Sequence, residues 1–262
     1  MLLCIDIGNS NIKLGLFDQN GMVKHWRIST NRSSLADEYA VLLLNLFEID
    51  GIKKDDINVC AISSVAPPLT EVFVELSKQY LNLDPIMFDT SMDIGMKINT
   101  DYPNEVGSDL IMNALAAREM FDSAVIVVGF GTATTFTAVS AAGNVEGVAI
   151  APGILTSTQT LFRTASTLPL VALKNPKAAI GKNTIESIRA GIVYGFVGLA
   201  EKLVVKMKKE LGGSPHVIAT GGLASLISLE TDIFDAVEPN LALIGLRTVS
   251  YTHLTLPTKR IV

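Results

Sequence analysis

The feature that most constrains this chain is a short glycine-containing turn that occurs twice, once in each half. The first copy reads Asp6-Ile7-Gly8-Asn9-Ser10 and the second reads Gly129-Phe130-Gly131-Thr132-Ala133. Each copy follows an apolar run and leads into an alternating run, which is the pattern of a β-hairpin. Aligned on Gly8 and Gly131, the two copies differ by a constant offset of 123 (129 − 6). The chain is therefore predicted to consist of two related halves.

Both turns have a composition that suits a phosphate group. Glycine lets backbone N–H groups converge on phosphate oxygens, and Ser, Thr and Asn place further donors beside them. Asp6 ends the first strand and could hold Mg²⁺, which prefers oxygen ligands. The alternative is an ordinary tight hairpin in each half, because one short glycine motif is weak support for a site. Two copies in register favour a nucleotide site.

The predicted elements also repeat around the two turns. Each half is expected to begin with three strands and to continue with helices that alternate with single strands. The predicted strands are 2–6, 12–17, 23–28, 58–64, 86–88, 124–128, 135–140, 146–150 and 216–220. The predicted helices are 36–47, 70–81, 111–120, 156–164 and 184–211, followed by a short final helix. This order predicts two α/β layers about a cleft, with both turns and Gly221-Gly222 facing it.

Composition limits the partners of the chain. It has 262 residues, 48% of them hydrophobic, and a formal net charge of −5 without a Lys/Arg-rich run, which argues against nucleic acid and anionic membranes. Ser123 to Val145 is uncharged and long enough to span a bilayer, but its Gly and Thr residues fit strand, turn and strand better. Cys4 and Cys60 lie in apolar runs without metal-ligand spacing, which predicts buried thiols in a reducing compartment.

Six spaced motifs resemble those of type III pantothenate kinases, in the actin-like, sugar-kinase and Hsp70-like ATPase superfamily. They are Asp6-Ile-Gly-Asn-Ser10, Tyr102-Pro-Asn-Glu-Val-Gly107-Ser-Asp109, Gly131-Thr-Ala-Thr-Thr135, Ala151-Pro-Gly153, Gly181-Lys-Asn-Thr184 and Thr220-Gly-Gly222, within about Met1 to Arg247. The resemblance implies a duplicated ribonuclease H-like fold, with halves 1–120 and 121–249 around an ATP cleft. It also implies ATP-dependent phosphorylation of pantothenate to 4'-phosphopantothenate, the first step of coenzyme A biosynthesis, by a cytoplasmic homodimer.

The resemblance further implies a role for each matched residue. The residues implied to bind ATP, with Mg²⁺ near Asp6, are Asp6, Ile7, Gly8, Asn9, Ser10, Asn11, Ile12 and Lys13, together with Thr132 from the second turn. Those implied to bind pantothenate are Gly107, Ser108, Asp109, Leu110 and Thr184, with Asp109 as the proton acceptor. Position 129 is where the family places a carboxylate for a monovalent cation, K⁺ or NH₄⁺.

The residues themselves leave two interpretations of Asp109 open. A carboxylate beside an attacking hydroxyl suits phosphoryl transfer, because the proton is accepted late in a loose transition state. Ser108 and Asp109 also precede a predicted helix at 111–120, where they could be plain capping residues.

Three positions depart from the family pattern. Leu110 stands where Arg follows the catalytic Asp, Gly129 stands where the second turn has Asp, and Ile244 stands near a usual Glu. Each change removes a charge, which leaves open a catalytically impaired nucleotide-binding relative or a regulatory partner of the same fold. A kinase of the superfamily that acts on a sugar is a further alternative, although the segment from Tyr102 to Asp109 speaks against it.

The last residues are expected to differ from the rest. From about Ser250 the sequence loses the preceding helical pattern, so residues 250–262 are interpreted as a non-native or disordered tail. The alternative is a genuine exposed extension.

Overall fold

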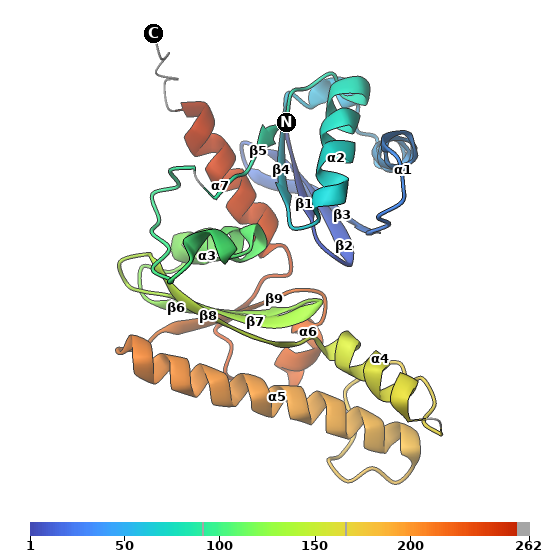
Figure 1. The fold of residues 1–262 in the computed structure, drawn as a ribbon, viewed down its shortest axis with the longest axis vertical. Helices are drawn as coiled ribbons and strands as arrows, with labels where there is room; N and C mark the ends of the chain where they lie inside the picture. The colour runs from blue at the N-terminus through green and yellow to red at the C-terminus, as the bar shows by residue number, and fades with distance from the viewer. Residues whose placement is uncertain (91, 166, 256–262) are drawn as a thin grey trace. The chain divides into compact units, whose positions relative to one another are not determined.

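The computed structural model describes residues 1–90, 92–165 and 167–255 and divides into two compact units (Figure 1). Of the described residues, the first unit contains those in Met1–Gly95, Tyr102–Ala116 and 242–255, and the second contains those in Met96–Asp101 and Ala117–Leu241. These units group residues that are close in space, whereas the expected division at residue 120 separates the two copies of the repeated strand and helix order. In the described ranges, the helices all fall short of the length and apolarity that crossing a bilayer requires.

The first unit is built on a five-stranded sheet in the order β3-β2-β1-β4-β5. Its strands are β1 (Leu2–Ile7), β2 (Asn11–Asp18), β3 (Gly21–Ser29), β4 (Val59–Ser64) and β5 (Ile86–Met87). β1 pairs antiparallel with β2 and parallel with β4. All six residues of β1 are buried, because it is a central strand with both faces covered.

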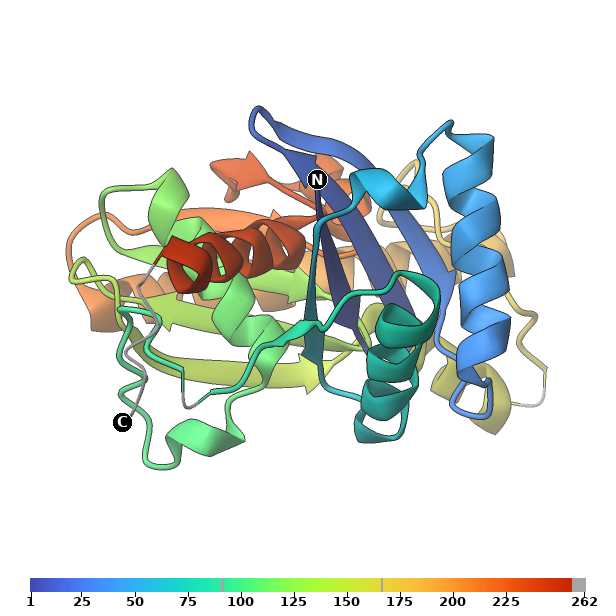
Figure 2. The ribbon, with the colours of Figure 1, turned by 90° about the horizontal axis from the view of Figure 1, so that it is seen from above.

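Helices α1 (Ala36–Ile49) and α2 (Pro67–Tyr80) cover one face of this sheet (Figure 2). Their apolar side chains form one core cluster with those of β1 and β4. At the start of α1, the Glu38 carboxylate accepts a hydrogen bond of 2.8 Å from the Leu35 backbone N–H. Pro67 opens α2, where its missing N–H leaves no hydrogen bond unmade.

Most of α3 (Ser108–Met120) and of α7 (Leu241–Thr255) belongs to the first unit, where α7 packs on β2. A Cβ added to Gly15 of β2 would lie 3.1 Å from a Leu243 methyl, and one added to Gly245 would lie 1.9 Å from the Met112 carbonyl oxygen. Gly245 therefore lets α7 cross α3 in close contact.

Helix α7 continues beyond the point where the sequence pattern changes. Ser250 is buried and its hydroxyl donates a 2.7 Å hydrogen bond to the Leu246 carbonyl, one turn earlier. Helix therefore extends to Thr255, which corrects both the expected loss of helical pattern at Ser250 and the expected shortness of the final helix. Residues 256–262 of the expected tail lie outside the described residues.

The second unit repeats the architecture of the first. Its sheet has the order β10-β9-β6-β7-β8, and its strands are β6 (Val125–Phe130), β7 (Ala133–Val139), β8 (Val145–Pro152), β9 (His216–Thr220) and β10 (Ala236–Val237). Helices α4 (Ile154–Thr164), α5 (Thr184–Leu211) and α6 (Ala224–Ile227) contribute to one core cluster with β6, β7 and β9. Three antiparallel strands followed by two parallel ones occur in both sheets, which confirms the duplication predicted from the two turns.

Candidate active site

A row of polar residues crosses the first sheet. Asp6 on β1 is the register partner of Lys13 on β2 and of Ser63 on β4. Register partners point to the same face of a sheet, and the alternate residues Ile5, Ile7 and Ile62 belong to the core under α1 and α2. Lys13, Asp6 and Ser63 therefore lie side by side on the opposite face.

Asp6 is a buried carboxylate with an unused acceptor. Its side chain is 7% exposed, and Oδ1 has no hydrogen-bond partner among the described residues. Burial raises the pKa of Asp6 to about 6, with the Asp109 carboxylate adding to the rise and the Lys13 ammonium opposing it. A buried carboxylate oxygen without a donor fits a hard cation such as Mg²⁺, which would supply the missing partner.

The start of α3 lies against the end of β4. The Ser63 hydroxyl donates to the Ser108 hydroxyl at 3.1 Å, and the Ser108 hydroxyl donates to the Ser64 carbonyl at 3.3 Å. A Cβ added to Gly107 would lie 2.6 Å from Asp109 Oδ1, so glycine leaves room for this carboxylate to turn back over the helix start. Burial raises the pKa of Asp109, while backbone N–H groups of Leu110 and Asp109 and the charge of Lys13 lower it.

Within this unit, Asp109 is close enough to Asp6 for its carboxylate to raise the pKa of Asp6, and the Lys13 ammonium lowers the pKa of both groups. Leu110, the next residue, is 7% exposed and presents a buried apolar side chain. Two carboxylates, one ammonium group and two hydroxyls converge where β1, β2, β4 and α3 meet.

The first turn is closed by its own hydrogen bonds. The Gly8 N–H donates to the Asn11 carbonyl at 3.1 Å, and the Thr30 hydroxyl donates to the Gly8 carbonyl at 2.7 Å. A Cβ on Gly8 would lie 2.7 Å from the Asn11 oxygen, which explains the need for glycine. The turn itself uses the Gly8 N–H as a donor, so the expected convergence of backbone N–H groups on phosphate would involve the other residues of the turn.

The second turn is one residue shorter. Its Gly131 N–H donates to the Ala133 carbonyl at 3.0 Å, and Gly129 pairs with Thr135 where Asp6 pairs with Lys13. The offset is 123 before the turn (129 − 6) but 122 after it (135 − 13), so the offset found for the aligned turn residues does not extend into the second strand of the hairpin. Thr135 therefore occupies the place of Lys13.

The position of Gly129 is partly filled by its neighbours. A Cβ there would lie 2.6 Å from the Thr135 hydroxyl oxygen and 3.8 Å from a Thr220 methyl. The Thr220 hydroxyl is buried and has no hydrogen-bond partner among the described residues. Hydroxyl groups stand here in place of a carboxylate.

Two further segments reach the second turn. A Cβ on Gly153, which precedes α4, would lie 2.2 Å from the Thr132 carbonyl oxygen, and the Thr156 hydroxyl donates to that carbonyl at 2.9 Å. Gly221 has a φ of +95°, and a Cβ there would lie 2.5 Å from the Phe130 carbonyl oxygen. The close approach of these glycines gathers the second turn, the α4 start and Gly221 in one place.

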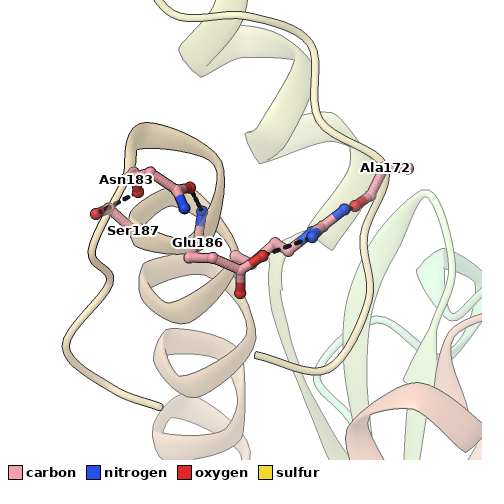
Figure 3. Close-up of polar contacts among 5 residues, drawn as sticks. Ala172, Asn183, Glu186 and Ser187 are labelled. Atoms are coloured by element: carbon pink, nitrogen blue, oxygen red, sulfur yellow. Dashed lines mark hydrogen bonds and ion pairs between the residues drawn. The ribbon is translucent and has the colours of Figure 1, made fainter. Parts of the chain in front are cut away.

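Thr184, the remaining expected substrate residue, is the exposed first residue of α5. The Asn183 side chain caps this helix by accepting a 3.0 Å hydrogen bond from the Glu186 N–H (Figure 3). The Arg189 guanidinium donates one hydrogen bond to the Glu186 carboxylate and another to the Ala172 carbonyl. These bonds attach the preceding loop to the start of the helix. The structure thus places Asp6–Lys13 and Gly107–Leu110 in the first unit, and Gly129, Thr132 and Thr184 in the second.

Residues 2–206 match the sequence model of the type III pantothenate kinase family. The chain belongs to this family. It is 49% identical over 249 residues to the type III pantothenate kinase of Roseiflexus sp. (strain RS-1), covering 95% of this chain and 98% of that protein. It is 48% identical over 247 residues to that of Geobacter sulfurreducens, covering 94% and 97%.

Solved structures support the fold assignment of this type III pantothenate kinase family member. A Sinorhizobium meliloti protein provisionally assigned as a 2-dehydro-3-deoxygalactonokinase has a TM-score of 0.63 at 14% identity, covering all of both chains. The (R)-2-hydroxyglutaryl-CoA dehydratase component A of Acidaminococcus fermentans has a TM-score of 0.55 at 14% identity, covering 96% and 98%. At these identities the likeness shows the fold alone, and it confirms the duplicated actin-like ATPase architecture.

Sequence reasoning missed Ser63, which borders the candidate site. It quoted Thr135 and Thr220 in motifs of the type III pantothenate kinase family but gave neither a role at position 129. Ser63 lies on β4 opposite Asp6, and Thr135 and Thr220 flank Gly129. Their positions follow from strand register, which joins residues far apart in the chain. A prediction of the parallel pairing of β1 with β4 and of β6 with β9 would have found Ser63 and placed Thr220 beside Gly129.

The raised pKa of Asp6 predicts a pH-dependent loss of stability. Its pKa is about 6 in the folded protein and about 3.9 when unfolded, so its favourable contribution is complete below about pH 4 and is lost as the pH rises through 6. In chelator-treated protein, Asp6→Asn should therefore gain unfolding free energy relative to the unaltered chain between pH 4 and pH 8, by roughly 1–3 kcal/mol. Urea unfolding measures the difference.

The exposed Asp84, which pairs with Lys78 at 3.1 Å, offers a control. Asp84→Asn removes a carboxylate of the same kind from an exposed position and gives the baseline with which Asp6→Asn is compared. An Asp6→Asn variant whose relative stability is the same at pH 4 and pH 8 would contradict the raised pKa.

Proposed function

We propose that this chain is an ATP-dependent kinase that phosphorylates pantothenate to 4'-phosphopantothenate, the first step of coenzyme A biosynthesis. The observation that carries the proposal is the family match over residues 2–206, which spans both carboxylates of the candidate site, Asp6 and Asp109. The likeness to named type III pantothenate kinases over 95% of the chain supports the same activity.

In the proposed mechanism, Asp109 accepts the proton of the pantothenate primary hydroxyl as that oxygen attacks the γ-phosphorus of ATP. The bond from the γ-phosphorus to the bridging oxygen breaks, and ADP leaves. Phosphoryl transfer depends mainly on positioning and on charge neutralisation, so the carboxylate needs no extreme pKa. The turn at Gly107 and the contacts of Ser108 hold Asp109 in place for this role.

The ATP phosphates are assigned to Asp6–Lys13, with Thr132 contacting ATP from the second turn. Bound Mg²⁺ would be held by Asp6 and would supply positive charge against the phosphate oxygens. Lys13 places an ammonium group beside Asp6, which supports a phosphate site next to these two residues of β1 and β2. Pantothenate is assigned to Gly107, Ser108, Asp109 and Leu110, with Thr184 as a further contact. Leu110 offers pantothenate an apolar contact in place of a charged one.

The residues around Gly129 do not fit the monovalent cation that the family is expected to hold. The site lacks the carboxylate, and the Thr135 hydroxyl oxygen lies 2.6 Å from where a Cβ would be. No catalytic step is therefore assigned to K⁺ or NH₄⁺ in this chain.

Weak K⁺ activation follows from the missing carboxylate. The turnover rate of the unaltered chain should rise little with K⁺ concentration, and Gly129→Asp should restore part of the response. Combining Gly129→Asp with Thr135→Ala should restore more, since it removes the hydroxyl that the new side chain meets at 2.6 Å. Initial rates against K⁺ measure this, and Thr135→Ala alone is the control. Strong K⁺ activation of the unaltered chain would refute the argument.

The loss of charge at Leu110, Gly129 and Ile244 favours a second candidate, a catalytically impaired relative that binds nucleotide or regulates a partner. A homodimer in the cytoplasm is proposed for either candidate. One assay separates the two candidates: pantothenate-dependent release of ADP across K⁺ concentrations, with the phosphorylated product identified by mass spectrometry. ATP binding without pantothenate-dependent ADP release would favour the impaired relative.

A further inference from the structure

Ser63 is buried, polar and outside every site motif in the sequence. Its side chain has 0% exposure, and it lies on β4 in register with Asp6 on β1. The neighbouring Ile62 faces the core under α1 and α2, so Ser63 points to the other face, where Lys13 and Asp6 also lie. A serine hydroxyl buried here must find a partner to offset its desolvation.

That partner is the first residue of α3. The Ser63 hydroxyl donates a hydrogen bond to Ser108 Oγ at 3.1 Å, and the Ser108 hydroxyl donates one to the Ser64 carbonyl at 3.3 Å. The two contacts bridge 45 and 44 residues of sequence. They connect the end of β4 to the helix turn that carries Asp109.

The restraint acts directly beside Asp109. Ser108 is the residue before Asp109, and a Cβ on Gly107 would lie 2.6 Å from Asp109 Oδ1, so the carboxylate turns back over the helix start. A shift of the Ser108 turn would therefore carry the Asp109 carboxylate with it.

We infer that Ser63 is a positioning residue, which fixes the distance of Asp109 from the Asp6 strand end through its hydrogen bond to Ser108. The inference rests on the proposed kinase function, in which Asp109 accepts the substrate proton. It assigns Ser63 no contact with either substrate.

Ser63→Ala should lower kcat on the order of 10-fold, because misplacing a reacting group by about 1 Å can reduce a rate by up to about 10²-fold. The KM for ATP should change little, since Ser63 does not contact the nucleotide. Ser63→Cys retains a small side chain with a weaker donor, so its kcat should lie between that of Ser63→Ala and that of the unaltered chain. It is also the less disruptive variant.

A matched control lies at the same strand end. The Thr70 hydroxyl of α2 donates to Ser64 Oγ at 2.9 Å, so Thr70→Val removes a hydroxyl-to-hydroxyl bond of similar length that does not reach α3. Thr70→Val should leave kcat unchanged. Equal loss of kcat in Ser63→Ala and Thr70→Val would indicate a general structural effect and overturn the inference.

A double-mutant cycle then tests the route. In a Ser108→Ala background, Ser63→Ala should have no further effect on kcat, because its partner is already absent. Native-state hydrogen exchange supplies a readout that is independent of activity. Ser63→Ala should speed amide exchange in the first turn of α3, whereas Thr70→Val should speed it in α2. The same kcat loss in both backgrounds, or unchanged exchange in α3, would refute the role of Ser63.

Failure of the proposed kinase function can be distinguished from failure of the positioning inference. If the unaltered chain releases no ADP with pantothenate, the kinase assignment fails, and the exchange measurement alone decides whether Ser63 restrains the Asp109 turn. Turnover by the unaltered chain together with normal turnover by Ser63→Ala would overturn only the positioning inference.

Discussion

Asp109→Asn is expected to lower kcat for pantothenate phosphorylation by about 10²-fold or more, the usual loss when a general base is removed. Asparagine has nearly the shape of aspartate but cannot accept the proton of the attacking hydroxyl. The backbone N–H groups at Asp109 and Leu110 that now lower the pKa of the carboxyl can still meet the amide oxygen. Steady-state rates at saturating ATP and pantothenate measure the loss.

The matched control is a carboxylate just beyond the other end of the same helix. Asp122 is exposed and lies two residues beyond the end of α3, so Asp122→Asn removes the same charge without touching the candidate site. It should leave kcat unchanged. Turnover of Asp109→Asn close to that of the unaltered chain, with both variants folded, would remove Asp109 from the mechanism.

The fold could be predicted largely because its signals are local. Alternating strands punctuated by glycine and asparagine located both hairpins, and the bounds of α5, Thr184–Leu211, match the prediction because Asn183 caps its start and Gly212 its end. The repeated order of elements then led to the duplicated fold, which both sheets and the family match confirm.

What could not be predicted depends on contacts between distant residues. The offset changes from 123 to 122 across the turn because hydrogen bonding pairs Gly129 with Thr135, and aligned letters do not reveal turn length. Helix α7 continues to Thr255 because tertiary packing buries Ser250 after the amphipathic pattern fades. Ser63 lies beside Asp6 through a parallel pairing of strands separated by 57 residues (63 − 6), which no local pattern records.

The site assignments themselves stay predictions that the structure makes more specific. It explains the glycines at Gly8 and Gly107 by close backbone and carboxylate contacts, and it brings Asp6 near Asp109. It also shows that the Gly8 N–H closes the first turn.

Asp6→Ala is expected to weaken binding of Mg·ATP by about 10- to 100-fold, the range seen when groups that support a bound metal are removed. Binding of ATP without metal should fall much less, or even strengthen. Asp6 is a buried carboxylate with an unpartnered oxygen, and its negative charge repels bare phosphate while it attracts a divalent cation. Calorimetric titration with ATP, with Mg²⁺ and with a chelator, separates the two affinities.

Asn9→Ala is the matched variant for this comparison, because it removes a polar side chain from the same turn without changing the charge. Asn9 is exposed and its amide oxygen accepts a hydrogen bond from Arg32 at 2.8 Å. Loss of Asn9 should weaken both forms of ATP by similar factors, since an amide in this turn acts on phosphate, whereas loss of Asp6 should be selective for the metal-bound form. Equal losses in Asp6→Ala with and without Mg²⁺ would mean that the carboxylate supports the fold of the strand end, and Mg²⁺ would then have to be held by another group.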